Sequence, residues 1–391
     1  MILSYHGLSR PKTILLFCFL IISSYFLLSH VWPAVYHYTL GPISQQLRYD
    51  AFQYAFTSEK KISVNLVVAT TAADDISWTL NLQIPNLNII RYVSDELSAP
   101  YHPPVPKGRE ALMYHTYLHD FYDDLPDISI FIHSHENPCK SSMTRTAPLK
   151  QNQRHLADSS HRWLGHIDSV LRQSMTFALS QLDLQQVLRK QYFNLRVSWK
   201  DACPDWINTT KTPEESYKQE EPYMAQAFRA NFGKNVPVPE ILAGPCCSQF
   251  AATRDAIRRR SKEEYRNYMD WLIYTEWSDY ISGRVWEHMW PWLFLEEPRD
   301  CTVEWLAFCR MYAICFEGPG ELEAFQKLSQ EKHDLMESTE FVNELLRPGQ
   351  ARGARRRMME INVLLDRNVR GALERGRNER LRHEITSDLS W

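Results

Sequence analysis

Residues 127–137, DISIFIHSHEN, contain the pattern that decides the fold. The run ISIFI is apolar apart from one serine, which is typical of a short strand buried on both faces of a parallel sheet. The chain then passes directly into His133, His135 and Glu136. Because open α/β sheets bind ligands outside the carboxyl ends of their strands, this stretch predicts an inner strand that delivers polar side chains to a ligand site.

Strand and helix patterns alternate on both sides of this stretch. Residues 108–126 place apolar side chains on one helical face, and Pro126 ends that helix before the central strand begins. Further strands are expected at 64–68, 86–93 and 192–199, and further helices at 161–179 and 282–297. The alternation predicts an α/β fold with a mainly parallel sheet flanked by helices.

The amino-terminal segment predicts a membrane anchor. Residues 13–47 contain no Asp, Glu, Lys or Arg, and their apolar part is long enough to cross a bilayer, which takes roughly 20 residues. Arg10 and Lys12 precede it, so the short tail should stay cytosolic and the rest of the chain should lie in the lumen. We therefore expect a single-pass type II protein of the Golgi or the endoplasmic reticulum. A cleaved signal peptide is the alternative.

The expected organisation follows from that anchor. It comprises a cytosolic tail at 1–12, a transmembrane signal anchor at 13–35, a stem at 36–60, a luminal α/β domain at 61–316 and a charged helical extension at 317–391. The extension carries ten Arg and six acidic residues from position 351 onward. Met358, Ile361, Leu365 and Val369 follow helical spacing there, which predicts a basic amphipathic helix. Packing on the protein, a membrane surface or a partner all suit such a helix.

Charge and cysteine usage narrow the class of protein. The net charge of -3 gives no reason to expect a nucleic-acid partner. Seven cysteines follow the anchor, and in an oxidising lumen up to three disulfides and one free thiol fit. The adjacent Cys246 and Cys247 are expected to bond to different partners, because neighbouring cysteines bridge only with strain. Asn208 opens a glycosylation sequon, which also favours the lumen.

Two loops could hold a phosphorylated ligand. The segment KGRE begins the helix after the second strand, and a helix amino-terminus offers free N–H groups to an anion. Gly108 allows close approach of the backbone, and Lys107 and Arg109 add positive charges that suit a diphosphate. Asp75, in the loop after the first strand, is the candidate for holding the nucleoside. A solvent-facing helix start is the alternative interpretation of KGRE.

The histidines after the central strand could bind a metal ion. In an extended segment His133 and His135 project to the same side, where both rings could face one ion. Glu136 could add an oxygen ligand or orient an imidazole. Imidazole suits Mn, Zn, Fe or Ni better than Mg, and we expect Mn. Two hydrogen-bonded core histidines are the alternative.

The chain order is similar to the nucleotide-sugar half of A-type glycosyltransferases. It runs strand, acidic loop, strand, Gly-led helix, and then a buried strand that ends in a polar triplet. In those enzymes the triplet is usually Asp-x-Asp, and its carboxylates hold a divalent ion on the donor diphosphate. The resemblance implies that His133, Ser134 and His135 occupy that place.

Four segments resemble a fungal family known only as a domain of unknown function, DUF3431. They are KGREALMYHTYLHDFYDDLPDISIFIHSH, NLRVSW, CCSQFAATRDAI and SGRVWEHMWPWLF, within about residues 62–316. Pro106 stands where the family tends to have Asn, and the usual Trp-His after the His-x-His is absent behind Asn137. The family carries no settled activity, so function has to come from the site.

The second half of the domain is expected to build the acceptor side. Glu287, on the aromatic helix, is the candidate for accepting the proton of an acceptor hydroxyl, with a structural Arg284–Glu287 pair as the alternative. Trp286, Trp290 and Trp292 could stack on sugar rings or pack in the core.

Three functions stay open at this stage. The first is a membrane-anchored, metal-assisted glycosyltransferase that moves a sugar from a nucleotide-sugar to a glycan acceptor. The second is a non-catalytic luminal binding or scaffold protein. The third is a metal-dependent phosphodiesterase that uses the same imidazoles. The chain has no GxSxG elbow and no HExxH motif, which argues against serine hydrolases and zincin proteases.

Overall fold

A computed structural model describes residues 61–137, 166–200, 202–338 and 348–386. The expected tail, anchor and stem at 1–60 lie outside these residues, as does Cys139. Among the helices of the described ranges, none combines the length and the apolarity that crossing a membrane requires.

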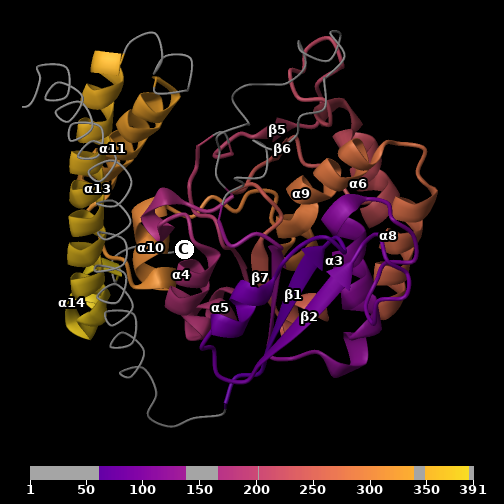
Figure 1. The fold of residues 1–391 in the computed structure, drawn as a ribbon. Coiled ribbons are helices and arrows are strands. Elements are labelled where there is room, and N and C mark those ends of the chain that lie inside the picture. The colour runs from indigo at the N-terminus through magenta and orange to yellow at the C-terminus, as the bar shows by residue number, and fades with distance from the viewer. Residues whose placement is uncertain (1–60, 138–165, 201, 339–347, 387–391) are drawn as a thin grey trace, which may run out of the picture. The chain divides into compact units, whose positions relative to one another are not determined.

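The centre of the fold is a five-stranded sheet (Figure 1). Its strands are β1 (Val64–Thr70), β2 (Leu87–Val93), β3 (Ile128–His133), β4 (Tyr192–Asn194) and β7 (Phe250–Thr253). Their order across the sheet is β2-β1-β3-β7-β4. The strand that we predicted from DISIFI is therefore the middle strand, and every residue of β3 before His133 is buried.

The sheet is mixed, and the expectation of a mainly parallel sheet is wrong. β1 pairs in parallel with β2 and with β3, whereas β7 runs antiparallel to both β3 and β4. A parallel neighbour requires a crossover, usually through a helix. The chain between β4 and β7 instead forms a small two-stranded sheet and one short helix before it returns, and β7 enters in the opposite direction.

Helices cover both faces of the sheet (Figure 1). Alternate residues of each strand point to opposite faces, so Val67 and Phe131 lie in one core while Leu66 and Ile130 lie in the other. The helices over the first core are α3 (Arg109–Asp120), α6 (Met224–Phe232), α8 (Lys262–Tyr274) and α9 (Asp279–Leu295). Those over the second are α4 (Met175–Gln181), α5 (Leu184–Lys190) and α10 (Glu304–Tyr312).

Short elements complete the domain and shift two expected boundaries. They are β5 (Ile207–Asn208), β6 (Ile241–Leu242), α7 (Arg254–Ile257) and the 3-10 turns η2 (Ser77–Asn81), η3 (Tyr122–Asp124), η6 (Ser169–Leu171) and η7 (Glu221–Tyr223). The helix expected to reach residue 179 is interrupted by positive φ angles at Arg172 and Gln173, and α4 begins only after the Ser174 cap. The strand expected at 192–199 ends at Asn194.

The carboxyl-terminal residues form α11 (Pro319–Ser338), α13 (Pro348–Arg377) and α14 (Glu379–Thr386). Ile361 and Val369 of α13 are buried, and Leu365 packs against the second core. The Cys315 N–H donates to the Ala372 carbonyl at 2.9 Å. The apolar face of the expected basic helix thus contacts the rest of the protein.

Candidate active site

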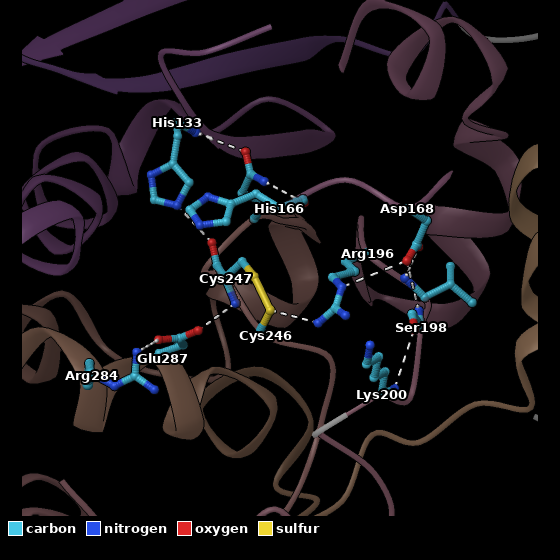
Figure 2. The surroundings of a disulfide bond; sticks show 12 residues. His133, His166, Asp168, Arg196, Ser198, Lys200, Cys246, Cys247, Arg284 and Glu287 are labelled. Atoms are coloured by element: carbon cyan, nitrogen blue, oxygen red, sulfur yellow. Dashed lines mark hydrogen bonds and ion pairs between the residues drawn. A yellow bond between two sulfur atoms is a disulfide. The ribbon is translucent and has the colours of Figure 1, made fainter. Parts of the chain in front are cut away.

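The candidate site lies where β3 ends, at the edge reached by the carboxyl ends of β1 and β3. His133 is the last residue of β3 and pairs with Ala69 of β1. Its N–H donates to the Gln249 side-chain oxygen at 3.2 Å, which ties the strand end to the segment before β7. Figure 2 shows the side chains that surround this point.

The His133 ring has a defined tautomer. Its Nε2 lies 2.8 Å from the Cys247 carbonyl oxygen, and because a carbonyl only accepts, Nε2 must carry the proton. Nδ1 then keeps its lone pair. Burial lowers the pKa of His133, so the ring stays neutral at neutral pH. A neutral imidazole whose second nitrogen is held by a carbonyl is the usual form of a metal ligand.

The ring beside His133 is His166, which lies just before η6. The two ring centroids are 5.2 Å apart, and Figure 2 shows the rings next to each other. Burial lowers the pKa of His166 to about 4, so this imidazole is neutral at pH 7 as well. His166 was not among the candidates from sequence, because no motif surrounds it and only the fold brings it to β3.

His135 and Glu136 take different positions from His133. The extended segment ends at a bend at Ser134, whose carbonyl accepts from the Trp78 indole, and His135 is exposed. Glu136 accepts from the Thr176 hydroxyl at 2.8 Å and so binds the first turn of α4. We predicted that His133 and His135 project to the same side because side chains alternate along an extended strand. The bend at Ser134 interrupts that alternation.

Glu287 of α9 comes to the same place from the opposite side of the site. Its Oε1 accepts from the Cys247 N–H at 2.6 Å, and its Oε2 lies 3.9 Å from Arg284 Nη1. Burial pushes the pKa of Glu287 up, but Arg284, His288 and the Cys247 N–H outweigh burial and bring it below its ordinary value. The expected Glu287 and His133 are thus joined through the backbone of one residue, Cys247.

A second carboxyl group, Glu110, lies in the first turn of α3. Burial raises the pKa of Glu110, and the charge of Glu287 raises it further, while Arg109 and Ser248 act in the other direction. Two interacting carboxyl groups whose pKa values move apart are a common feature of acid–base sites. Glu110 was not assigned a role from sequence, although it stands in the KGRE segment.

The KGRE residues are divided between the site and the core. Lys107 donates to the carbonyls of Ile273 (3.0 Å) and Thr275 at the end of α8. Gly108 has φ 68° and gives its N–H to Asp279, with a Cβ there lying 2.9 Å from Leu272. Only Arg109 remains exposed, stacked over Tyr280, and its charge acts on the pKa of both Glu110 and His133.

The remaining expected residues have other contacts. Asp75 is exposed, and hydrogen bonds from the Ser77 N–H and hydroxyl lower its pKa, so this carboxylate binds the first residue of η2. Trp286 and Trp290 are buried in the first core, where a sugar cannot stack on them. Asn208 lies at the end of β5, and its Oδ1 accepts from the Thr210 hydroxyl at 2.7 Å.

Cys246 and Cys247 are bonded to each other, so the expectation of separate partners is wrong. Cys247 and Ser248 both have positive φ, a backbone conformation that makes room for the neighbouring bridge. The other bridges in the described residues are Cys203–Cys301 and Cys309–Cys315. Ligand atoms of Cys246, Cys247 and Glu287 all lie within 4.8 Å, but the sulfurs are bonded to each other.

Arg196 approaches the bridge from the other side (Figure 2). Its Nη1 donates to Cys246 Sγ at 2.7 Å, and its Nε lies 3.7 Å from Asp168. Arg196 and Asp168 are both buried, and burial raises the pKa of Asp168 against the effect of the guanidinium. Two shallow hollows lie nearby, one lined by Glu287 and the other by Arg196, and their cavity volumes are about 0 and 10 Å³.

A family model described as "Protein of unknown function (DUF3431)" matches residues 66–310. This chain belongs to the DUF3431 family. The match spans the sheet, His133, the Cys246–Cys247 bridge and Glu287, so the candidate site lies wholly within the family domain. No curated protein and no solved structure matches the chain.

Proposed function

We propose that this DUF3431 protein is a glycosyltransferase that moves a sugar from a nucleotide-sugar donor to a glycan acceptor with the help of a divalent metal ion. In this proposal the chain is a type II protein anchored through residues 13–35, and its domain faces the lumen of the Golgi or the endoplasmic reticulum. The observation that carries the proposal is the backbone of Cys247, whose N–H donates to Glu287 and whose carbonyl accepts from His133. In this proposal it holds the proton acceptor and a metal ligand together at a strand end, where such sheets bind ligands.

Glu287 has the properties of the base. Its pKa lies below the ordinary value, so the carboxylate is ionised at neutral pH, and Arg284 and the Cys247 N–H orient it. Such a carboxylate can accept the proton of an acceptor hydroxyl in the transfer step. Burial raises the pKa of Glu110, which therefore keeps its proton to a higher pH than an exposed glutamate does.

The donor set beside β3 fits a divalent metal ion. His133 offers Nδ1, because its Nε2–H is held by a carbonyl, and the neutral His166 lies beside it. These two imidazoles, with His135 exposed on the same loop, favour Mn over Mg. A bound ion would supply charge neutralisation for the leaving diphosphate.

In this proposal Arg109 binds the diphosphate, a role that the sequence predicted for Lys107, Gly108 and Arg109 together. Its exposed guanidinium lies close enough to influence His133 and Glu110 and suits a diphosphate oxygen. Lys107 is left out, because its ammonium group is bound to the α8 carbonyls. Asp75, exposed in the loop after β1, stays the candidate for the nucleoside.

Calorimetric titration of the purified full chain with Mn²⁺ and a panel of sugar nucleotides tests the binding part. The wild type should bind a sugar nucleotide more tightly with Mn²⁺ than without it. His133→Ala and His166→Ala should each weaken the metal affinity by about 10- to 100-fold. The matched control is His119→Ala, because His119 pairs with Asp120 at the opposite end of α3. If the wild type binds neither Mn²⁺ nor any sugar nucleotide, the proposal that this protein is an enzyme is rejected.

Transfer to a glycan acceptor tests the role of Glu287. Glu287→Gln should lower the transfer rate by about 10²- to 10⁴-fold and leave donor affinity within about twofold, because only the base is lost. A comparable loss of donor affinity would instead give Glu287 a structural role. Hydrolysis of the sugar nucleotide without any acceptor would favour the phosphodiesterase.

A non-catalytic luminal binding protein is the second candidate, and two observations favour it. Lys107 is used within the fold, and the two hollows have cavity volumes of only about 0 and 10 Å³, far below the roughly 300–1,000 Å³ of most ligand pockets. Glycan-array binding without sugar-nucleotide binding would select this function over the transferase.

A further inference from the structure

The Cys246–Cys247 bridge lies between a cation and the candidate site. On one side Arg196 donates to Cys246 Sγ at 2.7 Å. On the other, the backbone of Cys247 holds Glu287 through its N–H and His133 through its carbonyl. Cys246 is 7% exposed, whereas Cys247 is only partly buried, so Cys247 is the more accessible residue of the bridge.

We propose that this bridge is a thiol-exchange site that a low-molecular-weight thiol opens by attack on Cys247. The proposal goes beyond the transfer of a sugar, and it holds whether or not the protein is a transferase. The exchange releases one of the two sulfurs as a thiolate. The sulfur that leaves should be the one whose thiolate is more stabilised by its surroundings. A guanidinium hydrogen-bonded to sulfur provides that stabilisation to Cys246 alone among the bridge's two sulfurs.

The exchange is balanced by thiol chemistry alone. A small thiol loses its proton to solvent, and its thiolate attacks Cys247 Sγ, forming a mixed disulfide while the Cys246–Cys247 bond breaks. The electron pair of the broken bond goes to Cys246, which leaves as a thiolate beside Arg196. A second thiol molecule then attacks the mixed disulfide, so Cys247 is released as a thiol and the two small molecules leave as their own disulfide.

The alternative is that the two reduced sulfurs and Glu287 bind a metal ion. Their ligand atoms lie within 4.8 Å of one another, but the Arg196 guanidinium already occupies one direction around Cys246 Sγ. A cation there would lie next to a buried positive charge, at a position where the same charge favours a free thiolate. The surroundings of the bridge therefore favour exchange over metal binding.

Opening the bridge also changes the site. Cys247 and Ser248 have φ values of 92° and 48°, which residues other than glycine rarely adopt. When the covalent link to Cys246 is lost, Cys247 can leave this conformation, and its peptide then withdraws from Glu287 and His133. We expect the adduct to loosen both side chains at once.

The test incubates the full chain with reduced glutathione, traps thiols by acid and alkylation, and maps adducts by peptide mass spectrometry. The expected result is a glutathione adduct on Cys247 with alkylated Cys246, at a time when the fully buried Cys309–Cys315 bridge is intact. An adduct that forms first on Cys246, or a bridge that outlasts Cys309–Cys315, overturns the proposal.

Two variants test the part played by the guanidinium. Arg196→Gln should slow adduct formation about tenfold, because it removes the charge at the leaving sulfur. Arg258→Gln, which alters an exposed arginine, should leave the rate unchanged. If Arg196→Gln does not fold, the order of reaction of the bridges in the wild type still decides the proposal. Sugar-nucleotide binding is measured on the same samples, and its absence alone would reject the transferase but not the exchange site.

Discussion

The parallel half of the sheet, β2-β1-β3, and the antiparallel half, β7-β4, are held by different interactions. β1 is buried along its whole length of seven residues, and its two neighbours pair with it through backbone hydrogen bonds and apolar contacts. β7 and β4 have four and three residues, which leaves little apolar surface to bury. The comparison teaches that short strands in this fold are supported by buried charges and disulfides.

The charges of the antiparallel half form a series of buried ion pairs. Lys190 binds Asp300 beside β4, and Arg196 lies against Asp168. Glu220, which is 1% exposed, forms an ion pair with Arg284 Nε at 2.9 Å and accepts from His288 Nε2 at 3.1 Å. It thereby fixes the segment before α6 on α9, the helix that packs against β4. Breaking such a pair costs more than its formation contributes, because the remaining partner stays buried and unpaired.

The largest effect is expected in the antiparallel half, on removing Glu220. Glu220→Ala should lower the free energy of unfolding by about 3–5 kcal/mol, because Arg284 and His288 lose their counter-charge. Urea denaturation followed by circular dichroism measures this loss. The control Glu214→Ala removes an exposed acid and should change little. A loss for Glu220→Ala no larger than the control's would mean that buried charges do not support this half.

Acid should reproduce the same effect in the wild type. Burial raises the pKa of Glu220, but His288 and Arg284 outweigh burial and bring it to about 2 from an ordinary 4.5. The unfolded chain therefore takes up this proton first, and the stabilisation is complete above pH 4.5 and disappears as the pH falls towards 2.

The stability of the parallel half should depend on apolar packing, so a cavity should lower it and a change of charge should not. Leu66, fully buried in β1, lies in the second core, and Leu66→Ala should cost about 2–5 kcal/mol of unfolding free energy. Leu80→Ala is the control, because Leu80 is 80% exposed. The difference between the two variants should be the same at pH 7 and pH 5. A difference that varies with pH would break the distinction between the halves.

The smallest effect on the free energy of unfolding is expected at one histidine, which makes the parallel half sensitive to acid. His115 of α3 is fully buried against Trp286, and neither ring nitrogen has a hydrogen-bond partner among the residues that the structure describes. Burial lowers the pKa of His115 to about 3 from 6.5, so its contribution is complete above pH 6.5 and declines as the pH falls towards 3.

His115→Phe keeps the ring and removes the titration. Between pH 7 and pH 5, the titration of His115 should lower the free energy of unfolding of the wild type by about 2 kcal/mol. The variant should not show this decrease. Thermal unfolding of both proteins at pH 7 and pH 5 measures it. His133 and His166 titrate in the same direction, so part of the acid sensitivity should persist in the variant. An unchanged pH dependence would show that water reaches His115.

The parallel half was largely predictable from the sequence, for a local reason. The runs VNLVV, NIIRYV and ISIFI are apolar and bounded by turn residues, and β1, β2 and β3 lie where these runs stand. The direction of β7 was not predictable, because FAAT carries no information about which neighbours it joins. Direction depends on the connection from β4, which has no regular pattern of its own.

The site was predicted in part, and the misses involve partners distant in sequence. His133 and Glu287 were selected from local patterns, and both side chains contact the backbone of Cys247. The use of Lys107 was missed because its acceptors, Ile273 and Thr275, are more than 160 residues away. The bridge between Cys246 and Cys247 depends on two positive φ angles, which sequence alone does not reveal for cysteine and serine. The one available signal for Glu110 was an acid in the first turn of a helix that follows a glycine.

The carboxyl-terminal helices have a practical consequence for producing this protein. The family match stops at residue 310, yet Arg375 of α13 donates to the Cys315 carbonyl, and Arg382 of α14 binds Asp183 at the start of α5. Val369, Ala372 and Leu373 belong to the same apolar core as Phe308 and Met311. A gene cut at the family boundary would therefore express a domain with an open apolar side, and shortened versions should retain the chain through residue 386.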